Sequence, residues 1–399
     1  MKPSEVRELL RLTIEKDVIS FGGGLPDPKL LPKGFELEGF FEYLSSVDEV
    51  AFQYGTTEGF PELREEVLNF MRSHSGISGD VDSIIITTGS QQALDISARL
   101  LLDRNDHVVV ELPTYLAALQ AFNLSEPRYV GVAVDDMGIR TDLLETKLKH
   151  LKSQNVQSKF IYTIPNFQNP SGVTMSEDRR RHLLELASRY DLLVIEDDPY
   201  RYISFDERPK TALKALDADG RVLYLSTFSK IIAPGLRVGW VVADKDLINK
   251  IALAKQGMDL CTSPLNQYLA LWCLRNGLVE KRLKVISEAY KRKRDLMLKT
   301  LEDSMPKGVR WTRPAGGMFV FVWLPDGMDT KAMMRRAITE YRVAYVPGRS
   351  FFVDDSGKNT MRLNFTYANE PDIKEGIGRL GRLIEQELEQ TLITNIPQA

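Results

Sequence analysis

The sequence predicts an α/β protein with a large domain built on a mostly parallel sheet and a smaller α+β domain. Two observations predict this fold class. Short β-rich runs alternate with longer helical patterns through the middle of the chain, which is typical of a parallel sheet covered by helices on both faces. Near residue 285 this alternation stops, and a long helical pattern is followed by only a few strand-like runs.

Seven strands are expected in the large domain, which we place at residues 46–285. Each is a short run rich in apolar or β-branched residues, and helical spacing of apolar residues lies between most of them, as at Ser90–Leu102 and Glu177–Tyr190. The predicted strands are Ser83–Thr88, His107–Leu112, Tyr129–Val134, Phe160–Ile164, Leu192–Glu196, Val222–Ser226 and Val238–Ala243.

The two ends of the chain are expected to pack together. Residues 1–45 contain a short helical pattern at Ser4–Leu12 and the Gly- and Pro-rich run Gly22–Pro28, and we expect them to pack with the small domain. Residues 286–399 are expected to form that α+β domain. Its predicted elements are a helix at about Val279–Asp303 that begins before the boundary, strands near Met318–Trp323 and Met361–Phe365, and a closing helix at Glu370–Thr391.

Composition excludes several classes of protein. Of the 399 residues, 43% are hydrophobic and 27% are charged, and the net charge of −3 does not point to nucleic acid. Two cysteines are too few for a disulfide framework. The chain shows no signal-peptide core and no run long enough to span a membrane, so we expect a soluble cytoplasmic protein. The basic run Lys281–Arg294 is interpreted as an amphipathic helix with a solvated basic face.

Lys230 lies in the most informative stretch, Ser226–Trp240, directly after a strand-like run. An amine that forms a Schiff base with a carbonyl cofactor needs a rigid, dry mount and a nearby anion site. Thr227, Ser229 and Arg237 can supply that site with two hydroxyls and a planar guanidinium group. A lone lysine after a strand is most often a surface charge, but the combination favours a cofactor lysine.

Two further motifs follow predicted strands. Gly89, Ser90 and Gln91 open a helix whose free N–H groups attract an anion, although glycine before a helix is most often only a turn. Tyr115 comes soon after the next strand, where its ring could stack on a pyridine ring. Taken alone, this tyrosine would more often be ordinary packing.

Asn169 and Asp197 also follow predicted strands. The Asn169 amide could donate to a phenolate-like oxygen, although an Asn-Pro-x-Gly run is usually a turn. Asp197 could keep a pyridine nitrogen protonated, which makes the ring an electron sink; the alternative is a capping or turn acid. Asp198 is expected on the opposite side of the chain, so Asp197 alone is predicted to act. All these motifs lie at the carboxyl ends of strands, where open α/β sheets bind ligands.

Together these motifs resemble the class I and II aminotransferases, enzymes of fold type I that use pyridoxal 5′-phosphate (PLP). The resemblance covers essentially the whole chain, and within the group it is similar to the 2-aminoadipate and kynurenine type, a fold also shared by the C-terminal part of MocR-like regulators. The segments that carry it are Ser20–Asp27, Gln53–Gly59, Gly89–Leu94, Asp197–Tyr200 and Pro314–Phe319.

The resemblance implies roles at the cofactor ring. Lys230 would bind PLP covalently and later act as the base, and Asp197 would pair with the pyridine nitrogen. Tyr115 would stack on the ring, while Asn169 and Tyr200 would contact the ring oxygen. No metal site is expected.

The resemblance also implies phosphate and substrate contacts. Tyr54 would reach the phosphate across a homodimer interface, and Arg362 would bind the substrate α-carboxylate. Gly24, in a glycine run with room for a mobile lid, is expected beside the substrate. Arg7 would meet the distal group of the substrate or is simply a helical surface residue. The other expected phosphate contacts are Gly89, Ser90, Gln91, Thr227 (serine in many relatives), Ser229 and Arg237.

The implied activity is transamination by a ping-pong mechanism. The expected donors are L-amino acids with 2-aminoadipate, aromatic or branched-chain side chains, and the expected acceptor is a 2-oxo acid, 2-oxoglutarate first. A decarboxylase or carbon–sulfur lyase of the same fold, and a non-catalytic PLP sensor, are the alternatives. Because about twenty residues precede the Gly22–Gly24 run, we do not expect the helix-turn-helix module of a regulator.

Overall fold

The computed structural model describes residues 17–205 and 211–394, and within them the central feature is an eight-stranded sheet. Five neighbouring strands, β8, β7, β6, β3 and β4, run parallel, whereas β9 is antiparallel to both β8 and β2. In sheet order the strands are β2 (Ile84–Thr87), β9 (Gly239–Val242), β8 (Val222–Thr227), β7 (Leu193–Asp197), β6 (Ser158–Thr163), β3 (His107–Leu112), β4 (Arg128–Asp135) and β5 (Gly138–Ile139).

All seven predicted strands are present in this sheet, with ends that differ by a few residues. The eighth, β5, was not predicted. It is only two residues long and pairs with the end of β4 in a tight hairpin, in which Gly138 has a φ of +92°. A run this short carries no periodic signal.

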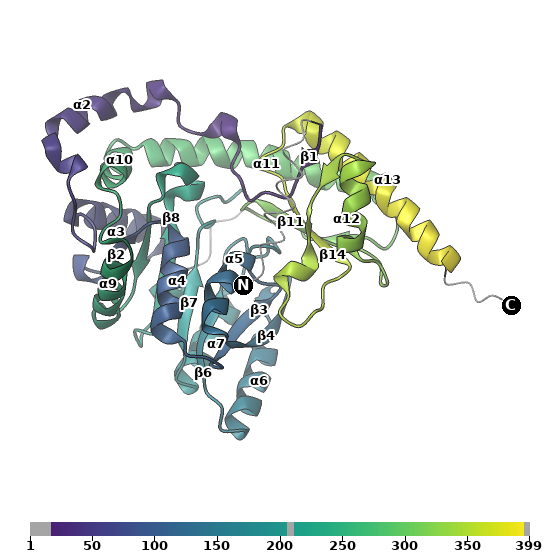
Figure 1. Ribbon diagram of the computed structural model, residues 1–399, viewed down its shortest axis with the longest axis horizontal. Helices are drawn as coiled ribbons and strands as arrows, with labels where there is room; N and C mark the ends of the chain where they lie inside the picture. The colour runs from purple at the N-terminus through teal and green to yellow at the C-terminus, as the bar shows by residue number, and fades with distance from the viewer. Residues whose placement is uncertain (1–16, 206–210, 395–399) are drawn as a thin grey trace.

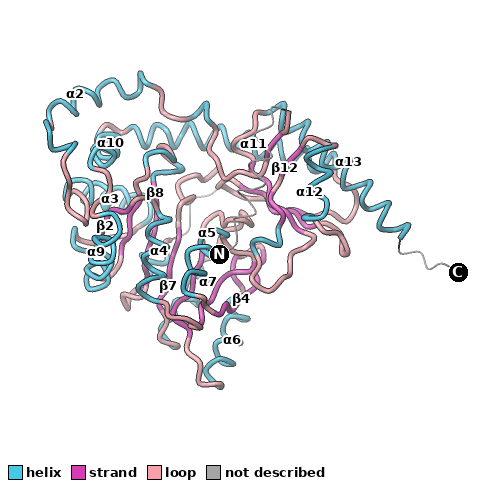
Figure 2. The backbone as a smooth tube through the Cα atoms, in the orientation of Figure 1, coloured by secondary structure: helices cyan, strands magenta, loops and turns pink. Residues whose placement is uncertain are grey.

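Helices cover both faces of the sheet, as Figure 2 shows. Along β3 the side chains alternate: Val108 and Val110 pack in the cluster that contains α4 and α5, whereas Val109 packs in the cluster of α6 and α7. Burial on both faces explains why the parallel strands are continuously apolar. The large-domain helices are α3 (Pro61–Ser75), α4 (Ser90–Leu101), α5 (Leu116–Phe122), α6 (Thr141–Ser153), α7 (Glu177–Arg189), α8 (Leu213–Leu216), α9 (Lys245–Asp259) and α10 (Pro264–Arg275).

The C-terminal part of the chain forms a second sheet of four antiparallel strands in the order β10-β11-β14-β13. A long helix, α11, extends from the large-domain helices to this part and packs along α13 (Figure 1). The elements are α11 (Leu278–Ser304), β10 (Arg310–Trp311), β11 (Phe319–Trp323), α12 (Thr330–Thr339), β12 (Val343–Ala344), β13 (Val346–Pro347), β14 (Thr360–Asn364) and α13 (Glu370–Thr394).

The N-terminal segment runs beside both sheets. Its strand β1 (Ile19–Ser20) pairs in parallel with β12, and α2 (Glu38–Ser46) contacts α10. The expected domain boundary at 285/286 falls inside α11, so the division into 1–45, 46–285 and 286–399 stays a prediction. The predicted helix Ser4–Leu12, and Arg7 within it, lie outside the described residues.

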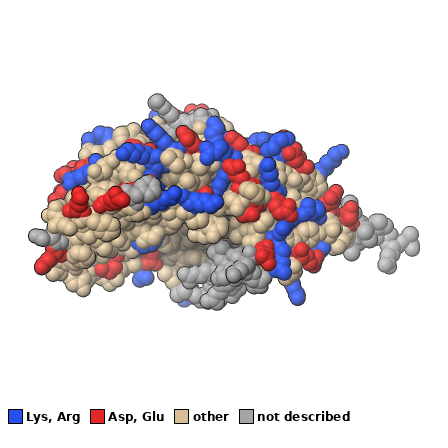
Figure 3. All heavy atoms as spheres, turned by 90° about the horizontal axis from the view of Figure 1, so that it is seen from above, with Lys and Arg blue, Asp and Glu red and all other residues tan. Residues whose placement is uncertain are grey.

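The face seen in Figure 3 mixes basic and acidic side chains without a patch of one sign. Among the residues that the structure describes, no helix is both long and apolar enough to cross a membrane.

Candidate active site

Lys230 comes from the short helical turn η6 (Phe228–Lys230) at the carboxyl end of β8. Its Nζ donates to the main-chain carbonyl of Gly24 at 3.0 Å. Burial, together with the nearby cations Arg362 and Arg237, lowers the pKa of the Lys230 amine to about 8. A substantial neutral fraction near neutral pH makes this amine a competent nucleophile and base.

Asp197 ends β7, the neighbour of β8, and is only 1% exposed. Tyr162 donates its hydroxyl to Oδ2 at 2.8 Å, whereas Oδ1 is buried with no hydrogen-bond partner among the described residues. Burial raises the pKa of the Asp197 carboxyl to about 7, the Tyr162 hydrogen bond opposes the rise, and the charge of Asp198 adds to it. A buried acceptor without a donor fits a protonated ring nitrogen.

Asp198 belongs to a different network. Its Oδ1 accepts from the Asn166 amide at 2.9 Å, and its Oδ2 lies 3.4 Å from the Tyr224 hydroxyl and 3.6 Å from the guanidinium of Arg201. All of these groups are buried. The two adjacent carboxyls therefore have different partners, and only Asp197 keeps an open oxygen.

Asn169, Tyr200 and Arg362 form one buried hydrogen-bonded group. The Asn169 amide donates to the Tyr200 hydroxyl at 3.1 Å, and Arg362 donates to the Asn169 Oδ1 at 2.9 Å. Arg362, from β14, lies 4.3 Å from the centre of the Phe319 ring, and burial lowers its pKa to about 10. Its Nε is buried without a partner among the described residues. This guanidinium therefore retains capacity for an anion.

Tyr115 caps the N-terminus of α5 and packs against the main core cluster. Burial, assisted by the charge of Asp197 and opposed by Arg362 and Arg237, raises the pKa of its phenol to about 12. The ring is therefore a neutral, partly buried surface at the same edge of the sheet as Lys230 and Asp197.

A cradle for an anion lies where β2 and β8 end and β9 begins. Gly89 has a φ of +79°, and a Cβ there would lie 2.5 Å from the Arg237 guanidinium, so only glycine fits. The hydroxyls of Thr227 and Ser229 are 2.9 Å apart, and Arg237 donates to Ser229 at 3.3 Å. Ser90 begins α4, whose first N–H groups have no helical partner. These groups suit a phosphate.

Two predicted phosphate contacts are placed differently. The Gln91 side chain donates to the carbonyl of Ala117 at 2.9 Å, so its amide is turned to α5 and only its main chain belongs to the helix start. Tyr54 is 77% exposed, next to the exposed Phe52. Within one chain the structure does not bring Tyr54 into the cradle.

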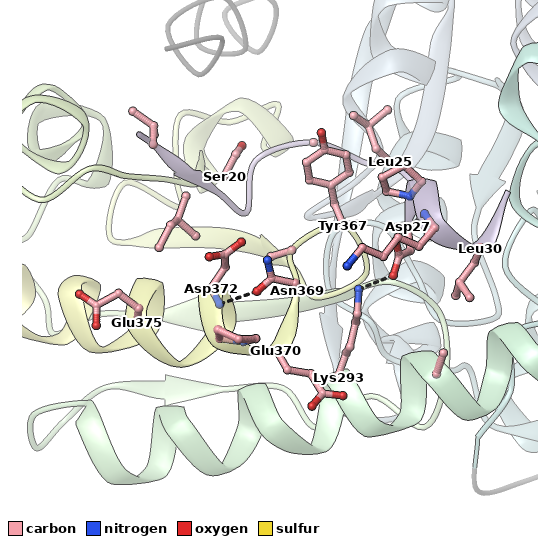
Figure 4. Close-up of a pocket in the computed structure, with 18 of the residues that line it drawn as sticks. Ser20, Leu25, Asp27, Leu30, Lys293, Tyr367, Asn369, Glu370, Asp372 and Glu375 are labelled. Carbon is pink, nitrogen blue, oxygen red and sulfur yellow. Dashed lines mark hydrogen bonds and ion pairs between the residues drawn. The ribbon is translucent and has the colours of Figure 1, made fainter. Parts of the chain in front are cut away.

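An N-terminal strap, residues 21–27, crosses the site with its main chain. The Gly22 carbonyl accepts from Arg362 at 2.7 Å, beside the Gly24 contact to Lys230. On its other face Asp27 pairs with Lys293 of α11 at 2.7 Å and borders a hollow of about 1590 Å³ (Figure 4). Backbone acceptors such as these carry no sequence signal.

The expectation of a solvated basic face on α11 was wrong in part. Arg282, Lys293 and Arg294 are buried. Lys293 bonds Asp27 and the Thr366 carbonyl, and Arg294 donates to the carbonyl of Pro314. Arg282 donates instead to the carbonyls of Ile231 and Ile232. Helical periodicity cannot indicate contacts of this kind, because they depend on the segments that cover the helix.

Comparison with known proteins gives matches that cover most of the chain. The family model of class I and II aminotransferases matches residues 45–380. The chain is 49% identical to aromatic-amino-acid aminotransferase 1 of Thermococcus litoralis, over 98% of this chain and 93% of that protein.

Two solved structures are similar over almost their whole length. A kynurenine aminotransferase of Pyrococcus horikoshii, in complex with PMP, is 52% identical with a TM-score of 0.94, covering 97% of this chain and 96% of that one. An α-aminoadipate aminotransferase of Thermus thermophilus, complexed with a phosphopyridoxyl-leucine, is 40% identical with a TM-score of 0.89, covering 98% of this chain and 96% of that one.

Proposed function

The chain belongs to the class I and II aminotransferases, a PLP-dependent family, and we propose that it transfers amino groups from several classes of L-amino acid to 2-oxoglutarate. The proposed donors carry aromatic, 2-aminoadipate-like or branched-chain side chains. The main support for this proposal is that Oδ1 of the buried Asp197 carboxyl has no hydrogen-bond partner among the described residues. This oxygen lies at the same sheet edge as Lys230.

We propose that PLP is bound by the residues gathered at this edge. Bound PLP supplies an electron sink for charge that develops at the amino acid α-carbon. Asp197 Oδ1 would accept from the ring nitrogen, Asn169 and Tyr200 would contact the ring oxygen, and Tyr115 would stack on the ring. The phosphate would lie among Gly89, Ser90, the Gln91 main chain, Thr227, Ser229 and Arg237.

Lys230 is the proposed base. Its Nζ would hold the cofactor until an amino acid takes its place, and would then remove the α-proton. A pKa of about 8 supports this role, because an amine that is partly neutral near pH 7–8 can both accept and return a proton.

Arg362 is the proposed site for the substrate α-carboxylate. Its guanidinium group already donates one hydrogen bond to Asn169 and another, from a second nitrogen, to the Gly22 carbonyl. A bidentate carboxylate would replace the Gly22 contact, since a charged acceptor forms the stronger hydrogen bond. Gly24 would then lie beside the substrate, and the N-terminal strap would act as a lid that excludes water. Arg7 remains proposed as a contact for a distal acidic group.

A donor panel tests this function directly. The purified protein with PLP and 2-oxoglutarate is incubated with L-phenylalanine, L-kynurenine, L-2-aminoadipate or L-leucine, and glutamate and the matching 2-oxo acid are quantified. Equimolar amounts of the two products are expected for donors of all three classes. Release of carbon dioxide without an oxo acid would contradict the proposal.

We further propose a cytoplasmic homodimer in which Tyr54 serves the partner's phosphate site. Support comes from the exposed Phe52 and Tyr54, which stand outside the site of their own chain. Sedimentation should give twice the mass of one chain, and Tyr54→Phe should weaken PLP binding about tenfold by loss of one hydrogen bond to an anion. A monomer, or unchanged PLP affinity, would contradict this proposal.

A further inference from the structure

The buried carboxyl group of Glu111 has no role in the proposed transamination. It lies near the end of β3 and is 1% exposed. Burial raises the pKa of its carboxyl to about 7, hydrogen bonds from Thr163, Gln168 and Ile164 oppose the rise, and the charge of Asp197 adds to it. A carboxyl is kept in such a place only if its hydrogen bonds compensate its desolvation.

Three donors converge on this carboxyl. The Thr163 hydroxyl donates to Oε1 at 2.6 Å, and Oε2 accepts from the Gln168 amide at 2.9 Å and from the Ile164 main-chain N–H at 3.3 Å. A carboxylate accepts at both oxygens and donates at neither, so it satisfies all three groups. Glu111 thus joins the end of β3 to the end of β6 and to the loop beyond it.

Gln168 carries this connection into the loops. The same Nε2 that contacts Glu111 donates to the Pro113 carbonyl at 2.7 Å, and Oε1 accepts from the Ser171 N–H at 2.8 Å. Were the amide reversed, its oxygen would face two acceptors and its NH₂ group would face an N–H donor. Glu111 and the Ser171 N–H therefore select one orientation of Gln168.

The two loops joined in this way hold the groups proposed to contact the ring. Asn169 directly follows Gln168, and Tyr115 comes two residues after Pro113. Asn169 in turn bonds Tyr200 and Arg362. No described hydrogen bond joins Glu111 to Asn169 or Tyr115, so its effect on them passes through Gln168.

We propose that Glu111 is a positioning residue that, through Gln168, sets Asn169 and Tyr115 relative to one another at the cofactor site. The inference rests on the proposed ring contacts of those two residues. Without the Glu111 oxygens, the Gln168 side chain keeps only the Pro113 carbonyl and the Ser171 N–H as partners among the described residues. Its orientation is then less well fixed, and the tie between the Asn169 loop and the β3 loop is weaker. The hydrogen bond from Asn169 to the ring oxygen then weakens. Because that bond favours the deprotonated, phenolate-like oxygen, its loss raises the pH at which the lysine-bound cofactor titrates.

Glu111→Leu removes both acceptor oxygens, and with them all three hydrogen bonds, at similar volume. Glu111→Gln retains an oxygen that can face Gln168 and Ile164 while its NH₂ group faces the Thr163 hydroxyl. Gln168→Met breaks the same connection from the loop side. Glu196→Leu is the matched control: Glu196 is also buried, with a pKa raised to about 7 by burial, but it accepts from the N–H groups of Leu213 and Lys214 at the start of α8.

The measurement is the pH titration of the lysine-bound cofactor band in each PLP-loaded protein, with kcat and KM for one donor. Glu111→Leu and Gln168→Met are expected to raise the midpoint by on the order of one pH unit and to lower kcat about tenfold, more than they change KM. Glu111→Gln should have a midpoint and a kcat close to those of the wild type. Glu196→Leu should lower Tm without changing the midpoint.

A wild-type midpoint in Gln168→Met would overturn the proposal, even where Glu111→Leu does not fold. An equal midpoint shift in Glu196→Leu would overturn it too, because the effect would then reflect general destabilisation. The titration needs no amino donor. A wild-type protein that binds PLP but fails to transaminate therefore still tests Glu111, while it contradicts the proposed function.

Discussion

The carboxyl edge of the large sheet and the N-terminal strap both contact Lys230 and its surroundings, but they use different groups. The sheet edge presents side chains held by buried partners, such as Asp197 with Tyr162. The N-terminal strap presents main-chain carbonyls, those of Gly22 and Gly24, to groups that a substrate and a cofactor also need. Under the proposed function, the edge would perform the chemistry and the strap would control access to it.

This difference predicts which kinetic parameter each region controls. Groups that act on the reacting atoms lower kcat when they are removed, whereas groups that only guide binding raise KM. Substitutions at the edge should therefore reduce kcat strongly. Substitutions at the strap or its anchors should change KM by smaller factors.

The largest effect is expected for Lys230→Ala. Removal of the nucleophile and base should lower turnover by at least about a thousandfold, while PLP is still held by the phosphate cradle and Asp197. Steady-state kinetics and bound-PLP quantification measure both. Lys245→Ala, an exposed lysine on α9 paired with Asp82, is the control and should retain activity. Normal turnover in Lys230→Ala would show that the sheet edge does not perform the proposed chemistry.

Asp197→Asn should lower kcat by about 10²- to 10³-fold, because an amide cannot stabilise a positive ring nitrogen. The same change should stabilise the cofactor-free protein. Burial raises the pKa of Asp197 to about 7, above its value near 4 in the unfolded chain. The folded protein therefore binds this proton more tightly, and the free energy of unfolding falls as pH rises from about 4 to about 7.

Thermal unfolding without PLP checks the second part. At pH 8 the Tm of Asp197→Asn should exceed that of the wild type by a few degrees, and the gap should close towards pH 4. Asp198→Asn should lower Tm instead, since it breaks the pair with Arg201. A lower Tm for both variants at pH 8 would mean that Asp197 is structural.

Arg362 contacts both regions, because it donates to Asn169 at the sheet edge and to the Gly22 carbonyl of the strap. A lysine keeps the charge but loses the planar two-pronged geometry, so KM for amino donors should rise about 10- to 100-fold with a smaller change in kcat. Initial-rate kinetics with two donors of different side chains measure this. Arg310→Lys, an exposed arginine of β10, is the matched control. Equal KM values in Arg362→Lys and wild type would place the carboxylate elsewhere.

The smallest effect is expected at the anchor of the N-terminal strap. Asp27→Asn keeps the main-chain bond from Asp27 to Tyr290 but removes the charge that faces Lys293. KM should rise about three- to tenfold, equivalent to roughly 1 kcal/mol of binding, with kcat within twofold. Asp303→Asn, which breaks an exposed pair with Lys299 on the same helix, should change neither. If Asp27→Asn lowered kcat and left KM unchanged, the proposed difference between the two regions would be contradicted.

Sequence reasoning located the sheet edge better than the N-terminal strap, for a physical reason. Asp197, Lys230 and Asn169 are polar residues that follow strand-like runs within a few residues, and parallel strands end at a common edge. The strap contacts are backbone carbonyls, which every residue possesses. The hydrogen-bond partners of Asp197 and Glu111 depend on the register of neighbouring strands, which the periodicity of one strand does not reveal. The burial of the Lys293 charge depends on the segments that cover α11, which helical periodicity does not reveal either.

The central claim is that the groups gathered at the sheet edge perform the transaminase half-reaction. The most direct test is the absorption spectrum of the PLP-loaded protein after addition of L-phenylalanine, L-leucine, L-2-aminoadipate or L-glutamate, with no 2-oxo acid present. We predict that the lysine-bound cofactor band converts to the pyridoxamine phosphate band for several donors, and that Lys230→Ala shows no conversion. A band that persists with every donor would contradict the account.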